Sequence, residues 1–155
     1  MNAARIVKAE PDQTRIVLRL VKELLLELED QPEEFVGFDE GKVLGDMNKA
    51  GERYIAYLAQ SSDGEWIGVI TVMEAFAIYA GGNYGIIDEM YVAPAYRSQG
   101  VGALLIDAVK KLGHQRGWLR LDVTAPPEGK WKRSVHFYES HCFVFTGPKL
   151  RFMFA

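Results

Sequence analysis

The sequence predicts an α+β fold with a mixed, largely antiparallel central sheet flanked by helices. Two segments, near residues 12–30 and 99–116, repeat apolar residues at helical spacing. Between residues 53 and 92, β-branched and aromatic residues form consecutive strand-like runs that short turns separate. The predicted order is one strand, two helices, three strands, a helix, a strand, a helix and two strands, which gives this fold class.

The first part of the chain predicts one strand and two helices. Residues 4–9 form a short strand-like run, and Pro11 opens the first helix, where its missing N–H group costs little. Apolar residues then recur at helical spacing from Ile16 to Leu28, and Pro32 ends the pattern. A weaker helical pattern covers residues 39–49.

The central part of the chain predicts three strands. Residues 53–60 and 66–76 form the first two, and the sequence at 61–64 between them is typical of a hairpin turn. Residues 86–92 form the third strand. Pro94 ends it, because proline cannot donate a hydrogen bond to a sheet.

The last part of the chain alternates helices and strands. A helix is predicted over residues 99–116, a strand over 119–124 and a short helix over 134–140. Two closing strands are predicted over residues 142–145 and 150–154.

Composition and charge exclude several classes of protein. The chain has 155 residues, which suits one domain over residues 1–155. Its 18 Lys and Arg against 21 Asp and Glu give a net charge of −3, which argues against a nucleic-acid module that depends on positive charge. No apolar run reaches the ~18 residues needed to cross a bilayer, and the first residues form no apolar leader. We expect a cytoplasmic protein with neither a nucleic-acid nor a membrane partner.

The cysteine and histidine content gives no metal site. Cys142 is the one cysteine, so no internal disulfide forms, and we interpret it as a small buried apolar group. The three histidines, His114, His136 and His141, lack metal-ligand spacing. We therefore expect no metal.

A glycine-rich turn is the most informative feature of the sequence. Arg97, Gly100 and Gly102 follow a strand and open a helix, so the N–H groups of residues 99–103 lie at a helix start. Such groups, with the positive end of the helix dipole, form an anion site, and Arg97 adds a charge. The turn has neither the lysine of a Walker loop nor three glycines of a dinucleotide fingerprint. An ordinary glycine-rich helix start with an exposed arginine is the alternative.

Two motifs carry a resemblance to a known family. Arg97-x-x-Gly100-x-Gly102 after the strand resembles the acetyl-CoA signature of the GNAT superfamily of N-acetyltransferases, whose pattern is Arg/Gln-x-x-Gly-x-Gly/Ala. The segment Phe137–Phe143 looks like the family's Phe-Tyr-Glu-x-x-Gly-Phe. The resemblance implies a GNAT-like fold.

The resemblance covers the chain from about Arg5 to Phe154, with two departures. Cys142 stands where the family has a glycine, and Trp131 stands where it often has an asparagine. An insertion-like segment, residues 126–130, precedes the second departure.

The resemblance implies that acetyl-CoA is the cosubstrate. Its pyrophosphate would lie on the main chain of the glycine turn, and its pantetheine arm along the strand before it, as an added strand. An N–H group of that strand would polarise the thioester carbonyl and stabilise the oxyanion, and the strand is usually splayed by a bulge. The residues implied are Met90, Tyr91 and Val92 for the arm, and Arg97, Ser98, Gln99, Gly100, Val101, Gly102 and Ala103 for the pyrophosphate.

The resemblance also implies direct attack of a neutral amine on the thioester. Tyr138 matches the family tyrosine that donates a proton to the leaving thiolate, and a core aromatic is the alternative. Glu89 and Asp122 are the two candidates for the general base; either carboxylate is alternatively solvated or ion-paired. Strand alternation would put Glu89 on one face with Ile87 and Tyr91.

The acceptor is the least specified part. Acidic residues dominate the stretch from Glu23 to Asp46, which would attract a cationic amine, although a hydrated helix face is the alternative. Tyr54, Trp66 and Trp131 are candidates for lining the acceptor pocket. A small-molecule amine is favoured over a peptide amine, a homodimer is left open, and a non-catalytic acyl-CoA sensor or partner module is the alternative function.

Overall fold

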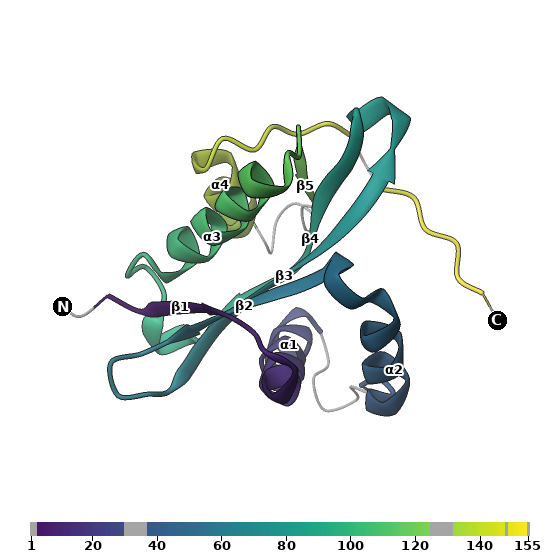
Figure 1. Ribbon diagram of the computed structural model, residues 1–155. Helices are drawn as coiled ribbons and strands as arrows, with labels where there is room; N and C mark the ends of the chain where they lie inside the picture. The colour runs from purple at the N-terminus through teal and green to yellow at the C-terminus, as the bar shows by residue number, and fades with distance from the viewer. Residues whose placement is uncertain (1–2, 30–36, 125–131, 148, 155) are drawn as a thin grey trace. The chain divides into compact units, whose positions relative to one another are not determined.

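The computed structural model describes residues 3–29, 37–124, 132–147 and 149–154. The chain divides into two compact units, Met1–Asp122 and Val123–Ala155, and each is described by itself. A five-stranded mixed sheet in the order β1-β2-β3-β4-β5 forms the centre of the fold (Figure 1). The predicted α+β class is confirmed. Within the described residues, no helix is long and apolar enough to cross a membrane.

The elements follow the predicted order as far as α4. Their bounds are β1 Arg5–Lys8, α1 Thr14–Leu28, α2 Glu40–Ala50, β2 Tyr54–Gln60, β3 Trp66–Ala77, β4 Gly82–Val92, α3 Val101–Arg116, β5 Leu121–Val123 and α4 Lys132–Ser140. The pairs β1–β2, β2–β3 and β3–β4 are antiparallel. Strand β4 begins before the predicted residue 86, because the turn after β3 is completed at Gly81.

The two predicted closing strands are wrong. Residues 142–145 and 150–154 have no strand structure. Their apolar side chains are mostly exposed, including Val144 at 81% and Phe152 at 80%. A strand requires a partner with which to exchange main-chain hydrogen bonds. A short run of apolar residues does not by itself supply that partner.

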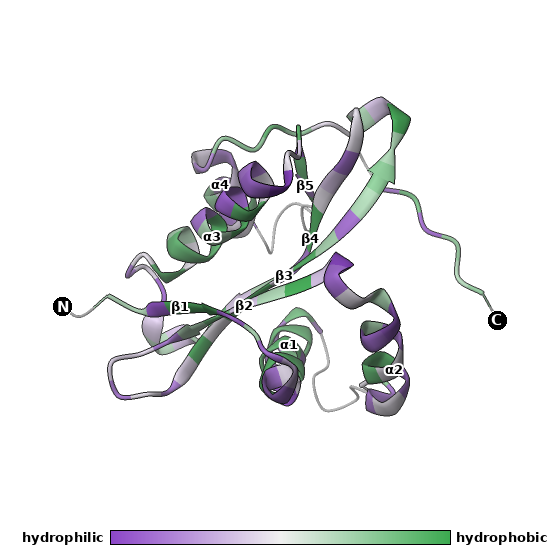
Figure 2. Ribbon diagram, in the orientation of Figure 1, coloured by the Kyte–Doolittle hydropathy of each residue, from purple (hydrophilic) through white to green (hydrophobic). Residues whose placement is uncertain are grey.

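Helices cover both faces of the sheet in the first unit, with α1 and α2 on one face and α3 on the other (Figure 1). The core on the first face joins helix and strand residues, which are Val17, Leu20, Val21, Ala56, Leu58, Val69 and Tyr91. On the opposite face, Leu105 of α3 lies beside Gly68 of β3. Figure 2 shows hydrophobic colouring along β1 and much of α1, whereas α2 alternates between the two colours.

Trp118 wedges between α3 and the first half of β4. A Cβ on Gly85 would lie 2.4 Å from the Trp118 ring, and one on Gly113 would lie 3.0 Å from it. Both positions therefore need glycine. The indole N–H of Trp118 also donates to the Glu74 carboxylate at 2.6 Å. This packing holds the C-terminal half of α3 against the sheet, so that its N-terminus stays at the end of β4.

Candidate active site

Strand β4 contains a one-residue bulge. Thr71 of β3 lies opposite Glu89, whereas the next β3 residue, Val72, lies opposite Ile87. Asp88 is therefore the extra residue. A bulge bends its strand and strengthens the local twist, and bulges are frequent beside active sites.

The bulge changes which side chains share a face. Thr71 and Val72 are neighbours on β3 and point to opposite faces, and their partners Glu89 and Ile87 follow them. The expectation that Ile87 shares a face with Glu89 is therefore wrong, because regular alternation stops at the extra residue. Glu89 does share its face with Tyr91, which packs against α1.

Glu89 is a half-buried carboxylate held by a neighbouring hydroxyl. The Thr71 hydroxyl donates to Glu89 Oε2, and the Glu89 main-chain N–H donates to Thr71 Oγ1 at 3.1 Å. Burial raises the pKa of the Glu89 carboxyl; the Thr71 bond opposes this rise and the charge of Asp88 adds to it. Burial also raises the pKa of the Tyr54 hydroxyl, and the charge of Glu89 contributes.

The glycine turn follows β4 directly. Pro94–Tyr96 forms a short 3-10 turn, and the next residues, Ser98 at φ 60° and Gly100 at φ 85°, are left-handed. Helix α3 starts there, since the Leu104 N–H donates to the Gly100 carbonyl at 3.1 Å. The three N–H groups before Leu104 have no acceptor within the helix. No heavy atom lies within 4 Å of where a Gly100 Cβ would be, so a ligand can approach the main chain.

The remaining residues of the predicted cradle surround this helix start. The Gln99 side-chain amide donates to the Ala95 carbonyl at 3.0 Å, which ties the turn to the segment before it. Val101 is 5% exposed and anchors the first turn of α3 in the core. Gly102 and Ala103 complete that turn. The main-chain N–H groups of this first helical turn are therefore held in fixed positions, as an anion site requires.

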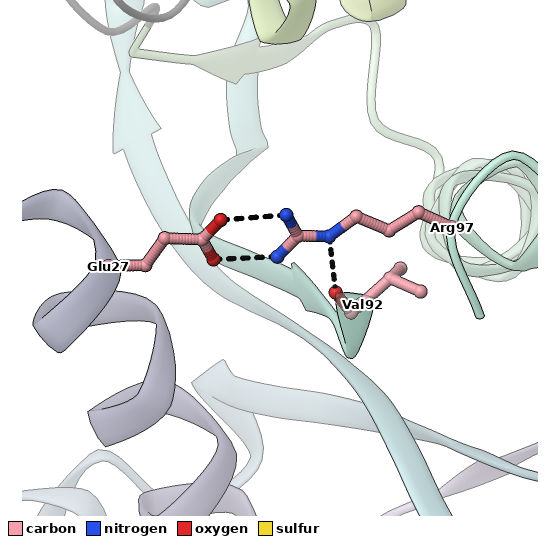
Figure 3. Close-up of polar contacts among 3 residues, drawn as sticks. All are labelled: Glu27, Val92 and Arg97. Carbon is pink, nitrogen blue, oxygen red and sulfur yellow. Dashed lines mark hydrogen bonds and ion pairs between the residues drawn. The ribbon is translucent and has the colours of Figure 1, made fainter. Parts of the chain in front are cut away.

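Arg97 is committed to an ion pair that the sequence did not predict. Figure 3 shows its guanidinium between Glu27 of α1 and the Val92 carbonyl. Nη1 and Nη2 donate to the two Glu27 carboxylate oxygens at 2.7 and 2.6 Å, and Nε donates to the Val92 carbonyl at 2.8 Å. The charge that Arg97 brings to the turn is therefore balanced by Glu27.

The segment Met90–Val92 keeps one strand edge beyond the reach of β5. Its other edge pairs with Ile70, Val69 and Gly68 of β3. β5 has three residues, and the residue before it, Arg120, bonds Gly85 near the start of β4. The end of β4 therefore extends past β5, which suits main-chain pairing with an extended ligand.

Asp122, the other candidate base, is paired with a cation. The Arg120 guanidinium donates to the two Asp122 oxygens at 2.9 and 2.6 Å. The same guanidinium lies over the rings of Tyr79 and Tyr84, at 5.2 and 5.5 Å from their centroids. Asp122 is therefore an ion-paired carboxylate, which was the alternative to a role as general base. Glu89, in contrast, has a hydroxyl partner and no cationic partner among the described residues.

Tyr138 lies on α4 in the second unit. Its ring packs edge-on against Phe137 and Phe143, with centroids 5.5 and 5.6 Å apart. Burial raises the pKa of its hydroxyl to about 12. The hydroxyl therefore stays protonated at neutral pH, as a proton donor must.

Cys142 ends α4 in an unusual conformation. Its φ is 71°, in the left-handed region that favours glycine. The N–H of Phe143 donates to the Tyr138 carbonyl and that of Cys142 to the Glu139 carbonyl, at 3.1 Å each, which is a Schellman motif. The family's glycine position is thus a left-handed cap. The interpretation of Cys142 as a buried apolar group is wrong, because it is exposed.

Sequence reasoning missed the partners of the site residues. Thr71 is one of several β-branched residues in the strand predicted over 66–76, and only its register opposite Glu89 distinguishes it. Of the predicted pocket aromatics, Tyr54 lies near Glu89, as the effect of that charge on its pKa shows. Trp66 instead packs against the core on the α1 face, and Trp131, with residues 126–130, lies outside the described residues.

The described residues contain no group of three or more His, Cys, Asp and Glu side chains that could hold a metal ion. Within the described residues, the site instead combines a half-buried carboxylate, a strand edge that β5 leaves open and an amide-rich helix start on one strand–turn–helix segment, Gly82–Arg116.

Comparisons with known proteins identify a family and a shared fold. The acetyltransferase (GNAT) family model matches residues 18–142. No curated protein gives a significant sequence match.

Solved structures share the fold at low sequence identity. The aminoglycoside acetyltransferase HMB0005, from an uncultured soil metagenomic sample, is 19% identical over 99% of both chains, with a TM-score of 0.78. The aminoglycoside acetyltransferase meta-AAC0020 in complex with sisomicin, also from such a sample, is 16% identical over 99% of this chain and 97% of its own, with a TM-score of 0.76. The ribosomal-protein-alanine N-acetyltransferase of Brucella melitensis biovar Abortus 2308 is 18% identical over 99% of this chain and 100% of its own, with a TM-score of 0.75.

Proposed function

This chain belongs to the GNAT acetyltransferase family and is an acyltransferase, and from that premise we propose that it moves the acetyl group of acetyl-CoA to a primary amine of a small molecule. One observation carries the proposal. On the bulged strand β4, a half-buried carboxylate, Glu89, comes directly before the free edge of Met90–Val92 and the helix start at Gly100. A base, a pantetheine-binding edge and a pyrophosphate cradle follow one another along the chain.

The residues of the turn fit the proposed cosubstrate. Acetyl-CoA supplies the thioester that carries the acetyl group. The N–H groups of residues 101–103 would hold its pyrophosphate, and the open space at Gly100 lets the phosphates approach the main chain. Arg97 would contribute mainly by fixing the turn, since Glu27 balances its charge. The main chain of Met90–Val92 would bind the pantetheine arm and polarise the thioester carbonyl.

We propose Glu89 as the general base and Tyr138 as the general acid. A carboxylate with a raised pKa takes a proton from the ammonium form of the acceptor more readily than an ordinary one, and this leaves the neutral amine that attacks. Asp122 is the weaker candidate, because its two oxygens already accept bonds from Arg120. Tyr138 would protonate the leaving thiolate, in keeping with its place in the matching motif and its protonated hydroxyl.

The proposed acceptor is a cationic small molecule. Glu23 of α1 and Glu29, which directly follows that helix, are exposed. Glu27 and Asp46, in contrast, are paired with Arg97 and Lys42. A cavity of about 350 Å³ lies between the segment that leads into α1, α2 and the start of β2, and Tyr54 is among its lining residues. That size suits a small ligand. Two of the similar structures are of aminoglycoside acetyltransferases.

A peptide acceptor is the second candidate, because a similar structure is that of a ribosomal-protein-alanine N-acetyltransferase. A non-catalytic acyl-CoA sensor is the third. We also propose a cytoplasmic location, since Cys142 leaves no pair for an internal disulfide. A single domain and a homodimer stay predictions; the family match across both compact units favours the single domain.

A thiol-release assay with acetyl-CoA tests the function. The acceptors are sisomicin, spermidine, lysine and a peptide that begins with alanine, each with and without protein. We expect release with a cationic small molecule and acetylated product in the mass spectrum. Release with the peptide alone would support the second candidate. Tight binding of CoA in calorimetry with no release from any acceptor would support the sensor and contradict the enzyme.

A further inference from the structure

Thr71 is a buried hydroxyl in the middle of the sheet, next to the bulge of β4. Among the described residues it is the one polar side chain that is buried, with 0% exposure. It lies on β3 opposite Glu89, at the last regular pair before the bulge. A buried hydroxyl needs hydrogen-bond partners, because leaving it unpaired would cost free energy.

The Thr71 hydroxyl bonds the same residue twice. Its oxygen accepts the Glu89 main-chain N–H at 3.1 Å, and its proton goes to Glu89 Oε2. A hydroxyl has one proton to donate, and the same hydroxyl also lies near the Tyr54 hydroxyl, whose pKa it lowers. The main chain of Glu89 and the end of its side chain are therefore fixed to one point on β3. The bulge would otherwise leave this part of β4 with a weaker register.

No other hydrogen-bond donor reaches this carboxylate among the described residues. The titratable groups that face it there are Asp88 of β4 and Tyr54 of β2, and neither is a cation. Burial and the Asp88 charge oppose ionisation of Glu89, and the Thr71 hydroxyl favours it. The hydroxyl thus acts on both the direction and the proton affinity of the carboxylate.

We propose that Thr71 is a positioning residue that aims the Glu89 carboxylate and keeps it ionisable. This inference rests on the proposed role of Glu89 as the base. Thr71 itself touches neither acetyl-CoA nor the amine. It acts through the two hydrogen bonds, which a side chain of the same shape without a hydroxyl cannot make.

Replacement of the hydroxyl tests the inference. Thr71→Val keeps the shape and removes both bonds, whereas Thr71→Ser keeps the hydroxyl. Thr14→Val is the control, since it removes a hydroxyl bond of 2.9 Å to the Pro11 carbonyl at the start of α1. The first readout is the pKa of Glu89 in the free protein, followed by carbon-13 NMR of its carboxyl group. The second is the pH dependence of kcat/KM with the fastest amine of the acceptor assay.

We expect Thr71→Val to raise the pKa of Glu89 by about one unit, because a bond to a charged group has been lost. The acid limb of the kcat/KM profile then moves upward by the same amount, and activity on that limb falls about tenfold at a given pH. Thr71→Ser and Thr14→Val should match the unmodified protein. A valine variant with an unchanged pKa and profile would overturn the inference.

Glu89→Gln separates this inference from the function on which it rests. If Glu89→Gln abolishes turnover while Thr71→Val changes neither readout, the base role stands and the positioning role fails. If Glu89→Gln keeps full turnover, the base role fails and the positioning role fails with it. Thr71→Ala, which also lacks a hydroxyl, replaces the valine variant if that variant does not fold, with the same expected shift.

Discussion

The carboxylate of Glu27 and the guanidinium of Arg97 form a two-pronged ion pair between α1 and the turn after β4, with N–O distances of 2.7 and 2.6 Å (Figure 3). The two residues are 70 positions apart in the sequence. Arg97 also bonds the Val92 carbonyl at the end of β4. The pair therefore joins the helix on one face of the sheet to the segment that opens α3.

Glu27→Gln is expected to lower the free energy of unfolding at pH 7 by about 1 kcal/mol, because the pair is partly solvent-exposed. The Arg97 bond lowers the pKa of Glu27, so the stabilisation is complete above the ordinary pKa of a glutamate and is lost as the pH falls through the lowered value. Urea unfolding at pH 7 and pH 3 checks this. Glu23→Gln, one turn earlier and exposed, is the control; an equal loss in both variants would contradict the prediction.

Glu89→Gln is expected to reduce kcat about 10²-fold, as removal of a general base does. Burial raises the pKa of Glu89, so its ionised form destabilises the fold above that pKa, and the protonated form does not. The glutamine variant should therefore be more stable than the unmodified protein at pH 8 and equally stable at pH 4. Asp122→Asn should keep most of the activity. Thermal unfolding measures the stability of the variants, and steady-state kinetics measures their kcat. A larger loss of kcat in Asp122→Asn than in Glu89→Gln would favour Asp122 as the base.

Gly100→Ala is expected to weaken binding of CoA at least tenfold, because alanine is strained at a φ of 85° and would shift the first turn of α3. Gly117 ends the same helix at a φ of 74° and also has open space around it. Gly117→Ala should therefore cost a similar free energy of unfolding, about 1–2 kcal/mol, without changing CoA affinity. Calorimetric titration measures the CoA affinity of both variants. Equal affinities would contradict the proposed pyrophosphate site at Gly100.

Tyr138→Phe is expected to lower kcat about 10²-fold with CoA affinity nearly unchanged. Since the pKa of Tyr138 is raised to about 12, its hydroxyl does not titrate between pH 6 and 9, and the loss should be constant over that range. Tyr57→Phe, a partly buried tyrosine on β2, is the control. Unchanged turnover in Tyr138→Phe at every pH would assign Tyr138 to packing alone.

Cys142→Gly is expected to stabilise the protein by about 0.5–1 kcal/mol, because glycine adopts the left-handed cap of α4 without strain. The greater freedom of glycine in the unfolded chain keeps the gain below the full strain energy. Cys142→Ala keeps the strain and should leave stability nearly unchanged. Chemical denaturation compares the three proteins, and a glycine variant no more stable than the alanine variant would contradict the argument.

The sequence predicted the helices and inner strands well, because each has its own local signal. The apolar stripe of α1, the turn between β2 and β3 and the glycines before α3 all act over a few residues. The extra residue Asp88 has no such signal, since a bulge depends on how β4 pairs with β3. The same holds for the partners of Glu89 and Arg97, which come from β3 and α1. Residues 142–145 and 150–154 show the converse, because their apolar residues predicted strands that the described residues do not form.

The bulge also sets a rule for how β4 tolerates change in length. Deleting Asp88 would make Ile87 and Glu89 neighbours, and they could stay opposite Val72 and Thr71, which are already neighbours on β3. Every other side chain of β4 would then keep its present face of the sheet. What would be lost is the local bend and extra twist that the bulge gives the strand beside Glu89. We therefore expect a protein without Asp88 to keep the pairing of β3 with β4 and to differ in how β4 bends where the free edge of Met90–Val92 begins.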